Sequence, residues 1–284
     1  LNALLASEVM RYEVIENELV EIKEKYADER RTRIIKMATE FNPEDMYADD
    51  DMVITISHLG YIKRTPLADF RQQGRGGVGA KASAARDEDF IEYVHQANMH
   101  STMMFFTEQG RLYWTKVYEL PEGNRQSKGR ALQNMINIQK GDKVCAFIHV
   151  KNLSDMEYVQ NHYLIFATKN GLMKKTTLES YSRPRANGII ALGLREDDRL
   201  IRVTLTDGNS QMLVASYNGK VVRFPEDTVR PMGRTATGVR AIKLDEDGKD
   251  RVIGMICVEE GSKESVLVIS EKGFGKRTDL DDEN

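Results

Sequence analysis

Basic residues recur at matched positions in this sequence, and side chains of this type bind phosphate groups. They come three and four residues after a glycine that ends a predicted turn. Because neighbouring strand residues face opposite sides, we expect one member of each pair to point outward with its counterparts. Cations repeated in this way would form a track for a long polyanion such as duplex DNA, although solubilising a strand edge is the simpler alternative. The candidates are Lys63, Arg64, Lys174, Lys175, Arg223, Lys276 and Arg277, whereas Tyr113 and Trp114 occupy these places in one repeat.

A second recurring element joins arginine to flexible glycine. It reads RQQGRGG, RQSKGRAL, RPRANGIIAL and RPMGRTATGVRAI. The guanidinium fork suits phosphate oxygens, while glycine exposes backbone N–H groups and permits close approach to a sugar-phosphate backbone. A structural role, in which the first of these loops closes the fold by joining its two ends, is compatible with binding. The candidates are Arg71, Gln73, Arg75, Gly76, Gly77, Gly79, Lys81, Arg125, Lys128, Arg130, Arg183, Arg185, Arg230 and Arg234.

Other possible sites have weaker support. The G-x-G-x-x-G match that begins at Gly74 has no apolar strand before it, so a dinucleotide site is not expected. Tyr12 stands among glutamates that would repel a phosphate, and the aspartates from Asp245 to Asp250 lack the glycine of a calcium loop. The five histidines are scattered without a matching nucleophile. The sequence therefore predicts no catalytic residues and no metal site.

The elements that must position the cations are short strands. One pattern returns five times: an apolar strand, a turn that ends in glycine, and a second strand. A third apolar stretch follows in DFIEYV, KVCAFIHV, RLIRVTL and RVIGMICV. Repeats of roughly 50 residues are typical of propeller blades. The sequence predicts an all-β, propeller-like fold of repeated antiparallel four-stranded blades, the fifth incomplete, and the turn glycines are Gly60, Gly110, Gly171, Gly219 and Gly273.

The start of the chain has a different character. Residues 1–38 predict a long amphipathic helix, because apolar residues from Tyr12 to Tyr26 alternate in steps of three and four. Residues 39–51 indicate an acidic linker, and residues 52–284 make up the β domain. The first two segments are acidic and most of the third is basic, a division that permits a polyanionic partner.

The composition excludes several classes of protein. A chain of 284 residues with 40% hydrophobic content is long and apolar enough to fold, and it has no run of about 18 apolar residues that a membrane helix needs. Its two cysteines, Cys145 and Cys257, have no metal-ligand spacing and fit a reducing cytosol. Because the sequence begins with Leu1, we expect it to be an internal part of a longer protein.

One stretch resembles a known family. The segment QGRGGVG, flanked by Arg71 and Lys81, resembles the Gln-Arg-Arg-Gly-Gly-x-Gly box found in the C-terminal domain of the A chain of DNA gyrase. The hairpin FFTEQGRLYWTKVYEL and the passage IKEKYADERRTRI are also similar to that family, so the resemblance covers nearly the whole chain. Gly74 stands where the family usually has arginine, and Val78 stands where lysine is common. We expect the two flanking cations to compensate.

The resemblance implies a β-pinwheel whose blades exchange a strand with their neighbours. In that family duplex DNA bends around a basic outer edge, without sequence specificity, and the leading helix is the end of a coiled-coil arm. The wrapped DNA presents a positive crossing for ATP-dependent negative supercoiling in the bacterial cytoplasm, at the nucleoid. The implied partners are duplex DNA, the B subunit of gyrase and a second A subunit, in an A2B2 complex.

The resemblance also implies what this part of the protein lacks. ATP and Mg²⁺ belong to the parent topoisomerase, so this part is expected to hold no cofactor and to be no enzyme by itself. One alternative is the C-terminal domain of the topoisomerase IV A subunit, which selects DNA segments for decatenation. A protein-interaction propeller is another, and it would tolerate salt. A propeller enzyme would need acids converging on a channel, and the sequence aligns none.

Overall fold

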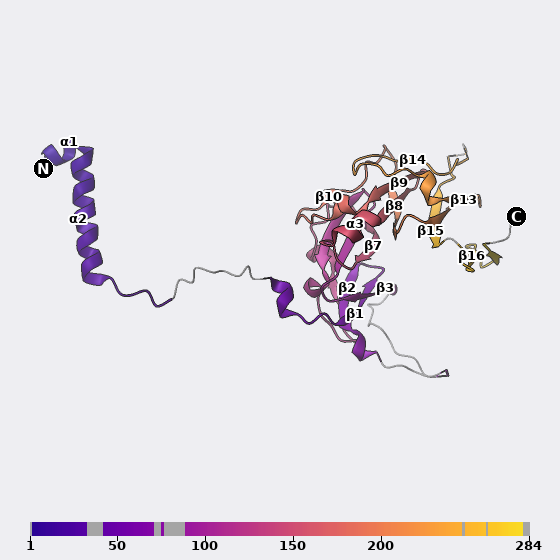
Figure 1. Cartoon of the computed structure of the whole chain (residues 1–284), viewed down its shortest axis with the longest axis horizontal. Coiled ribbons are helices and arrows are strands. Elements are labelled where there is room, and N and C mark those ends of the chain that lie inside the picture. The colour runs from indigo at the N-terminus through magenta and orange to yellow at the C-terminus, as the bar shows by residue number, and fades with distance from the viewer. Residues whose placement is uncertain are drawn as a thin grey trace. The chain divides into compact units, whose positions relative to one another are not determined.

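The computed structural model divides into two compact units, Leu1–Pro43 and Glu44–Asn284. Figure 1 draws both: the first contains helices, and the second is built mainly of strands. The residues that the structure describes are 2–32, 42–70, 75–76, 89–245, 248–259 and 261–280.

The first unit contains a helix that is shorter than the sequence predicts. Helix α1 spans Asn2–Ala6 and helix α2 spans Glu8–Tyr26. They are separated at Ser7, whose hydroxyl oxygen accepts a hydrogen bond of 3.5 Å from the Met10 N–H and so caps α2. The predicted helix is therefore confirmed, but it ends at Tyr26, and residues 33–41 lie outside the described residues.

Where the structure describes the second unit, it is all-β apart from the six-residue helix α3 (Met156–Asn161) and short 3-10 turns. Its described strands form five antiparallel sheets, one for each predicted hairpin, which we call blades 1 to 5 in chain order. The strands are β1 (Asp51–Ser57), β2 (Tyr61–Pro66), β3 (Ile91–Asn98), β4 (Thr102–Thr107), β5 (Arg111–Lys116), β6 (Arg130–Ala131), β7 (Val144–Val150), β8 (Tyr163–Thr168), β9 (Leu172–Thr177), β10 (Ile189–Ile190), β11 (Leu200–Thr206), β12 (Ser210–Ser216), β13 (Val221–Pro225), β14 (Val239–Arg240), β15 (Val252–Glu259), β16 (Ser265–Ile269) and β17 (Gly275–Asp279).

Each blade is built around a hairpin and most gain a third strand from the stretch that follows it. The hairpins are β1–β2, β4–β5, β8–β9, β12–β13 and β16–β17. Their turn glycines have the positive φ that favours glycine, for example 81° at Gly60. Strands β3, β7, β11 and β15 pair with the first strand of the first four hairpins. The predicted hairpin repeat is confirmed.

A fourth strand reaches blades 1, 2 and 3 from the following part of the chain. The two-residue strands β6, β10 and β14 pair with β2, β5 and β9, and the sheet orders are β3-β1-β2-β6, β10-β5-β4-β7 and β11-β8-β9-β14. The described strands of blade 4 have the order β13-β12-β15, and those of blade 5 are β16 and β17. Strand exchange between neighbouring blades, which the family resemblance implies, is therefore present in this chain.

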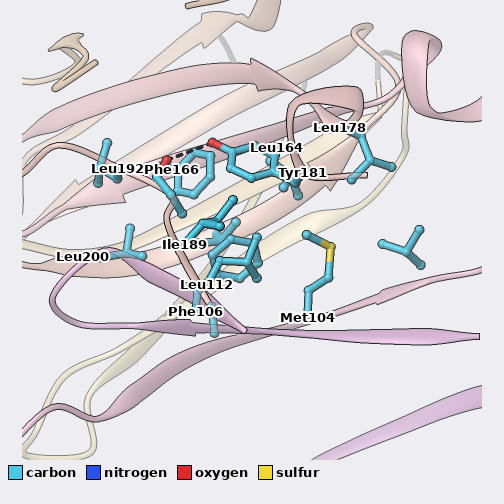
Figure 2. Close-up of a cluster of buried hydrophobic side chains, with 14 of the residues drawn as sticks. Met104, Phe106, Leu112, Leu164, Phe166, Leu178, Tyr181, Ile189, Leu192 and Leu200 are labelled. Carbon is cyan, nitrogen blue, oxygen red and sulfur yellow. Dashed lines mark hydrogen bonds between the residues drawn. The ribbon is translucent and has the colours of Figure 1, made fainter. Parts of the chain in front are cut away.

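The hydrophobic core lies between successive blades. Strand β4 is apolar on both faces: Met103 and Phe105 pack toward blade 1, and Met104 and Phe106 pack toward blade 3. Figure 2 shows the cluster that contains Met104 and Phe106. There the rings of Phe106 and Phe166 meet edge to face, with their centroids 5.6 Å apart. Because alternate residues of a strand face opposite sides, a strand between two cores must be apolar throughout. This explains the continuous apolar runs of the sequence.

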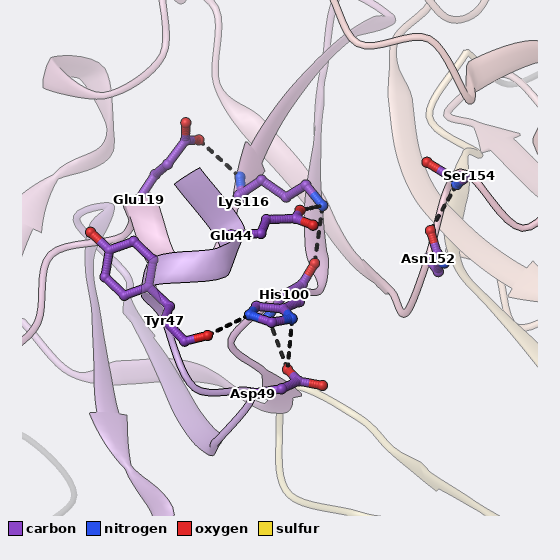
Figure 3. A network of polar contacts seen from close by, with 8 residues as sticks. All are labelled: Glu44, Tyr47, Asp49, His100, Lys116, Glu119, Asn152 and Ser154. Carbon is purple, nitrogen blue, oxygen red and sulfur yellow. Dashed lines mark hydrogen bonds and ion pairs between the residues drawn. The ribbon is translucent and has the colours of Figure 1, made fainter. Parts of the chain in front are cut away.

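The stretch before β1 also contacts the blades (Figure 3). The Glu44 carboxylate pairs with the Lys116 ammonium, and the ring of Tyr47 stacks on that of Tyr118 with centroids 5.0 Å apart. Nε2 of His100 lies 2.8 Å from the Tyr47 carbonyl oxygen. Residues read as linker from the sequence therefore pack on blade 2 near its second strand.

Some features are not found within the described residues. None of the helices there has the length and apolar character needed to cross a membrane. In the same residues, no group of three or more His, Cys, Asp and Glu side chains could hold a metal ion. Cys145 and Cys257 are free thiols, and burial raises the pKa of each to about 12. Burial therefore favours the protonated thiol at both positions.

Candidate nucleic-acid interface

Four of the paired basic residues that follow the turn glycines are buried. On β2, Lys63 and Arg64 are 1% and 6% exposed, and on β9, Lys174 and Lys175 are 0% and 4% exposed. The prediction that one member of each pair faces outward is wrong for these four residues. The reason is strand exchange, because the segments that deliver β6 and β14 pass over β2 and β9 and bind these cations.

The ammonium group of Lys63 binds the backbone of a turn in the segment that leads into β6. We call a segment that leads into an exchanged strand a crossing segment, and we name it by the blade that receives the strand. Its Nζ donates to the carbonyl oxygens of Asn124 at 2.7 Å and Ser127 at 3.0 Å. These residues begin and end a β-turn that is closed by a hydrogen bond of 3.1 Å from the Ser127 N–H to the Asn124 carbonyl. Burial lowers the pKa of Lys63. The lysine therefore acts here as a structural donor.

Lys174 has the matching role in blade 3. Its Nζ donates to the carbonyl oxygens of Arg234 and Ala191, both at 2.6 Å, and to the Tyr181 hydroxyl at 3.3 Å. An ammonium group has three donors, so this arrangement satisfies all of them. The group also lies 4.7 Å from the centroid of the Phe166 ring. Burial, with a smaller effect of the Arg234 charge, lowers the pKa of Lys174 to about 7.

The second member of each buried pair forms an ion pair. The Arg64 guanidinium lies 2.9 Å from the Glu122 carboxylate, and the Lys175 ammonium lies 2.9 Å from that of Glu226. Glu226 is itself only 1% exposed and also accepts a hydrogen bond of 2.7 Å from the Thr206 hydroxyl. Both acids belong to the stretch that follows the next hairpin. These ion pairs therefore also join one blade to the chain of the next.

Blade 2 makes the same kind of contact with different residues. Tyr113 occupies the place of the buried lysine, and Arg111 donates from Nε to the Tyr113 hydroxyl at 3.2 Å and from Nη2 to the Asn187 carbonyl at 3.1 Å. Sequence reasoning missed Arg111, because it follows the turn glycine directly rather than at the repeated offset. Its place beside Gly110, in the one repeat without a basic pair, is the signal that could have revealed it.

Cations also lie on the crossing segments themselves. In blades 1 to 3 each segment makes a β-turn closed by a carbonyl-to-N–H hydrogen bond of 2.9 to 3.1 Å, and an arginine lies in the turn. This regularity was not visible from the sequence alone. The turns and their arginines are 124–127 with Arg125, 185–188 with Arg185, and 233–236 with Arg234.

Residues 75–76 are described as part of a turn. Gly76 has a φ of 86°, and both residues are exposed. In the sequence, Arg75 stands four residues before Gly79, as Arg125 stands four residues before Gly129. The remaining candidates of this segment, namely Arg71, Gln73, Gly77, Gly79 and Lys81, lie outside the described residues, so their roles stay predictions.

The other predicted cations lie on the surface. Arg125 and Arg234 are half-buried. Arg223 on β13 donates from Nη1 to the Leu280 carbonyl. The exposed candidates are Arg75, Lys128, Arg130, Arg183, Arg185, Arg223, Arg230, Lys276 and Arg277.

The glycines of the crossing segments have a packing role as well. Gly129 and Gly238 have φ of 77° and 95°, and each lies against the strand that its segment joins. A Cβ on Gly129 would stand 2.5 Å from the Ile62 carbonyl oxygen, and one on Gly238 would stand 2.3 Å from that of Met173. Only glycine permits so close an approach. The recurring Arg–Gly pattern thus combines an arginine in a turn with a glycine that lets the exchanged strand lie close to its partner strand.

Blades that exchange strands with their neighbours define a β-pinwheel, and in blades 1 to 3 each crossing segment has a turn that contains an arginine. The sequence also matches a family model described as "DNA gyrase C-terminal domain, beta-propeller" over residues 51–98, 101–151, 162–207, 211–259 and 264–282. These five ranges follow the five blades. The chain belongs to the DNA gyrase C-terminal domain family.

Curated relatives are A subunits of DNA gyrase. The chain is 44% identical over 271 residues to the DNA gyrase A subunit of Salmonella typhimurium, a match that covers 95% of this chain and 30% of the relative. It is 42% identical over 279 residues to the DNA gyrase A subunit of Staphylococcus epidermidis, covering 98% of this chain and 31% of the relative. The chain therefore spans less than a third of the length of these relatives.

Solved structures of related domains have the same fold. The C-terminal domain of DNA topoisomerase IV matches with a TM-score of 0.68 and 27% identity, over 82% of this chain and 68% of that one. The DNA gyrase A C-terminal domain matches with a TM-score of 0.61 and 23% identity, over 81% of this chain and 72% of that one. At this low identity the second match is evidence for the fold alone.

Proposed function

We propose that the β unit binds duplex DNA through the arginine-bearing turns and bends it along the surface that they share. The observation that carries this proposal is that the segment before each exchanged strand of three successive blades makes a β-turn that contains an arginine. One guanidinium group can donate two parallel hydrogen bonds to one phosphate, and a β-turn lets the backbone approach the phosphates closely. The only helix described in this unit, α3, has six residues, so we expect no helix to read the major groove.

The energetics require several contacts at once. Bending a few tens of base pairs costs on the order of 1 to 6 kcal/mol, which a single surface cation does not offset. A row of arginines that neutralise successive phosphates does so by releasing counterions. Binding is therefore expected to be insensitive to base sequence, except through the bendability of the DNA, and highly sensitive to salt.

Because the relatives are A subunits of DNA gyrase, we assign this wrapping to that enzyme. The wrapped DNA presents a positive crossing to strand passage, which ATP drives toward negative supercoils. The partners are the B subunit of gyrase and a second A subunit, at the nucleoid in the bacterial cytoplasm. ATP, Mg²⁺ and the cleaving residues belong to other parts of the complex, so this part works without a cofactor and without catalysis.

A topology assay tests wrapping. The purified chain is added to circular DNA that is relaxed because it carries a nick. A ligase seals the nick, the protein is removed, and the distribution of topoisomers is measured. Wrapping predicts a shift in linking number that grows with protein concentration, and a log-log plot of affinity against salt with a slope of about −0.9 per neutralised phosphate. A slope equal to one or two contacts contradicts wrapping. Protein capture that resists high salt, without DNA binding, supports a protein-interaction propeller instead.

The likeness to the topoisomerase IV domain favours a second candidate, the selection of DNA segments for decatenation. That role needs DNA binding and bending but no constrained crossing. Segment selection is the better assignment if the chain binds and bends DNA, with an affinity that falls steeply as salt rises, but leaves the linking number unchanged. A shift in linking number supports the gyrase role.

A further inference from the structure

We propose that Lys63 and Lys174 are positioning residues that hold the arginine-bearing turns in the geometry that DNA requires. Both side chains are buried, so they act through the backbone of the turns rather than by touching phosphate. This inference rests on the proposed function, because it gives the turns their purpose. It also accounts for the recurrence of lysine three residues after a turn glycine at positions that do not reach the surface.

The contacts of Lys63 fix the turn of blade 1 at both ends. Asn124 and Ser127, whose carbonyl oxygens it binds, are the first and last residues of the turn that contains Arg125. If the turn opened, the buried ammonium would lose two acceptors, and an unpaired buried charge is costly. The backbone of Arg125 is therefore held between two anchored residues, and its side chain begins from a defined point.

The contacts of Lys174 join two successive crossing segments. One acceptor is the carbonyl of Arg234 itself, in the turn of blade 3. Another is the carbonyl of Ala191, which directly follows β10 in the segment that crosses to blade 2. A single ammonium group thus fixes the turn of one blade relative to the crossing segment of the blade before it. The spacing between this turn and that crossing segment decides whether Arg234 and Arg185 both reach phosphates of one duplex.

Blade 2 supports the same conclusion through different residues. There the Arg111 guanidinium donates to the Asn187 carbonyl, inside the turn that begins at Arg185, and Tyr113 replaces the lysine. A contact from a cation to a turn carbonyl thus occurs in all three blades that receive an exchanged strand. Because the residues differ and the contact is retained, the contact itself is what these blades have in common.

The decisive experiment is a double-mutant cycle on the whole chain. Lys63→Met keeps the length of the side chain and removes its donors, and Arg125→Gln removes the surface charge. DNA affinity is measured by fluorescence anisotropy at fixed salt for each single variant and for the double variant. We expect each single change to weaken binding by roughly 5- to 10-fold and the double change to weaken it no further, because residues in one network are not additive.

Two readouts separate positioning from other effects. Lys151→Met removes one exposed charge outside the turns and is expected to leave affinity within about twofold, which controls for net charge. In Lys63→Met we expect exchange of the Ser127 amide hydrogen to accelerate at least about tenfold, while amides of β4 keep their protection. The exchange readout needs no DNA, so it tests the lysine contact even if the chain fails to bind DNA and the proposed function falls.

A rescue variant tests the proposal even if Lys63→Met does not fold. Tyr61→Arg combined with Lys63→Tyr places the Arg111 and Tyr113 pair of blade 2 at the matching positions of blade 1. We expect this variant to protect the Ser127 amide and to bind DNA within about twofold of the unmodified chain. The proposal is overturned if the Lys63→Met and Arg125→Gln losses are additive, if the Ser127 amide is unaffected, or if the folded rescue variant binds as weakly as Arg125→Gln.

Discussion

At the scale of single residues, the two ion pairs that join neighbouring blades differ in burial. The Glu226 carboxylate is buried with Lys175 and also accepts from the Thr206 hydroxyl, whereas the side chain of Glu122 is 61% exposed beside Arg64. Removing one partner of a buried pair leaves a charge without compensation, but water screens an exposed partner.

We therefore expect Glu226→Gln to lower the free energy of unfolding by about 3 to 5 kcal/mol and Glu122→Gln by about 0 to 1 kcal/mol. Urea denaturation followed by circular dichroism measures both, and each variant serves as the matched control of the other. Equal losses in the two variants would contradict the difference in burial.

Two histidines on the third strands of blades 1 and 2 predict a dependence of stability on pH. Burial lowers the pKa of His95, with smaller effects of the charges on His149 and Arg202, and burial also lowers the pKa of His149. Below about pH 6.5 the unfolded chain takes up protons that the folded chain does not, so stability falls as pH decreases. The free energy of unfolding, measured by urea denaturation, should be lower at pH 5.5 than at pH 7.5, by at most about 1.4 kcal/mol per histidine and pH unit. Replacing both residues by Gln should flatten this dependence; an unchanged slope would contradict it.

The buried lysines show what sequence can and cannot predict about single residues. The offset from the turn glycine drew attention to Lys63 as a surface cation, but the residue is buried and its acceptors lie 61 and 64 residues further along the chain. Lys276 has the same offset and is exposed in the described structure. Whether the lysine at this offset is exposed depends on whether a distant segment crosses its strand. The sequence around the lysine does not indicate that crossing.

At the scale of elements, the exchanged strand depends on a close contact between backbones. Gly129→Ala would place a Cβ 2.5 Å from the Ile62 carbonyl at a φ of 77°. Gly219→Ala shares the positive φ, 84°, but meets no atom within 4 Å. We expect the first change to cost at least about 2 kcal/mol more than the second, because it adds a steric clash to the same backbone strain.

Hydrogen exchange locates the effect of Gly129→Ala. The amides of β6 should lose protection, while the hairpin β1–β2 keeps its own. Similar unfolding free energies in the two glycine variants would mean that the exchanged strand moves aside easily. The contact would then make little contribution to joining the blades.

The elements that sequence predicted are those with long apolar patterns. The five hairpins and four third strands follow from runs of apolar residues next to turn glycines, and all are present. The exchanged strands β6, β10 and β14 have two residues each, too few for a period to show. Helix α2 ends at Tyr26 although the sequence pattern favours a longer helix, and its apolar stripe is exposed throughout, so no packing extends it.

At the scale of the whole β unit, the shared cores fix each blade to the next and so set the spacing of the turns. Strand β4 packs into cores on both of its faces, and β8 does the same between blades 2 and 4. A stiff duplex can contact several turns only if they follow its curved path. Affinity and bending are therefore expected to respond differently to the loss of one turn.

Arg125→Gln, Arg185→Gln and Arg234→Gln test this difference. Each change should weaken binding by a similar factor and reduce the salt slope by about 0.9, because each removes one phosphate contact. Since the turns lie on different blades, the losses in affinity should add when the changes are combined. The shift in linking number should fall more steeply, and loss of the central Arg185 should reduce it most, because the bend needs contacts on both sides of its midpoint. If all three variants reduce the shift equally and in proportion to affinity, the turns act as independent adhesive sites and no continuous path of bent DNA joins them.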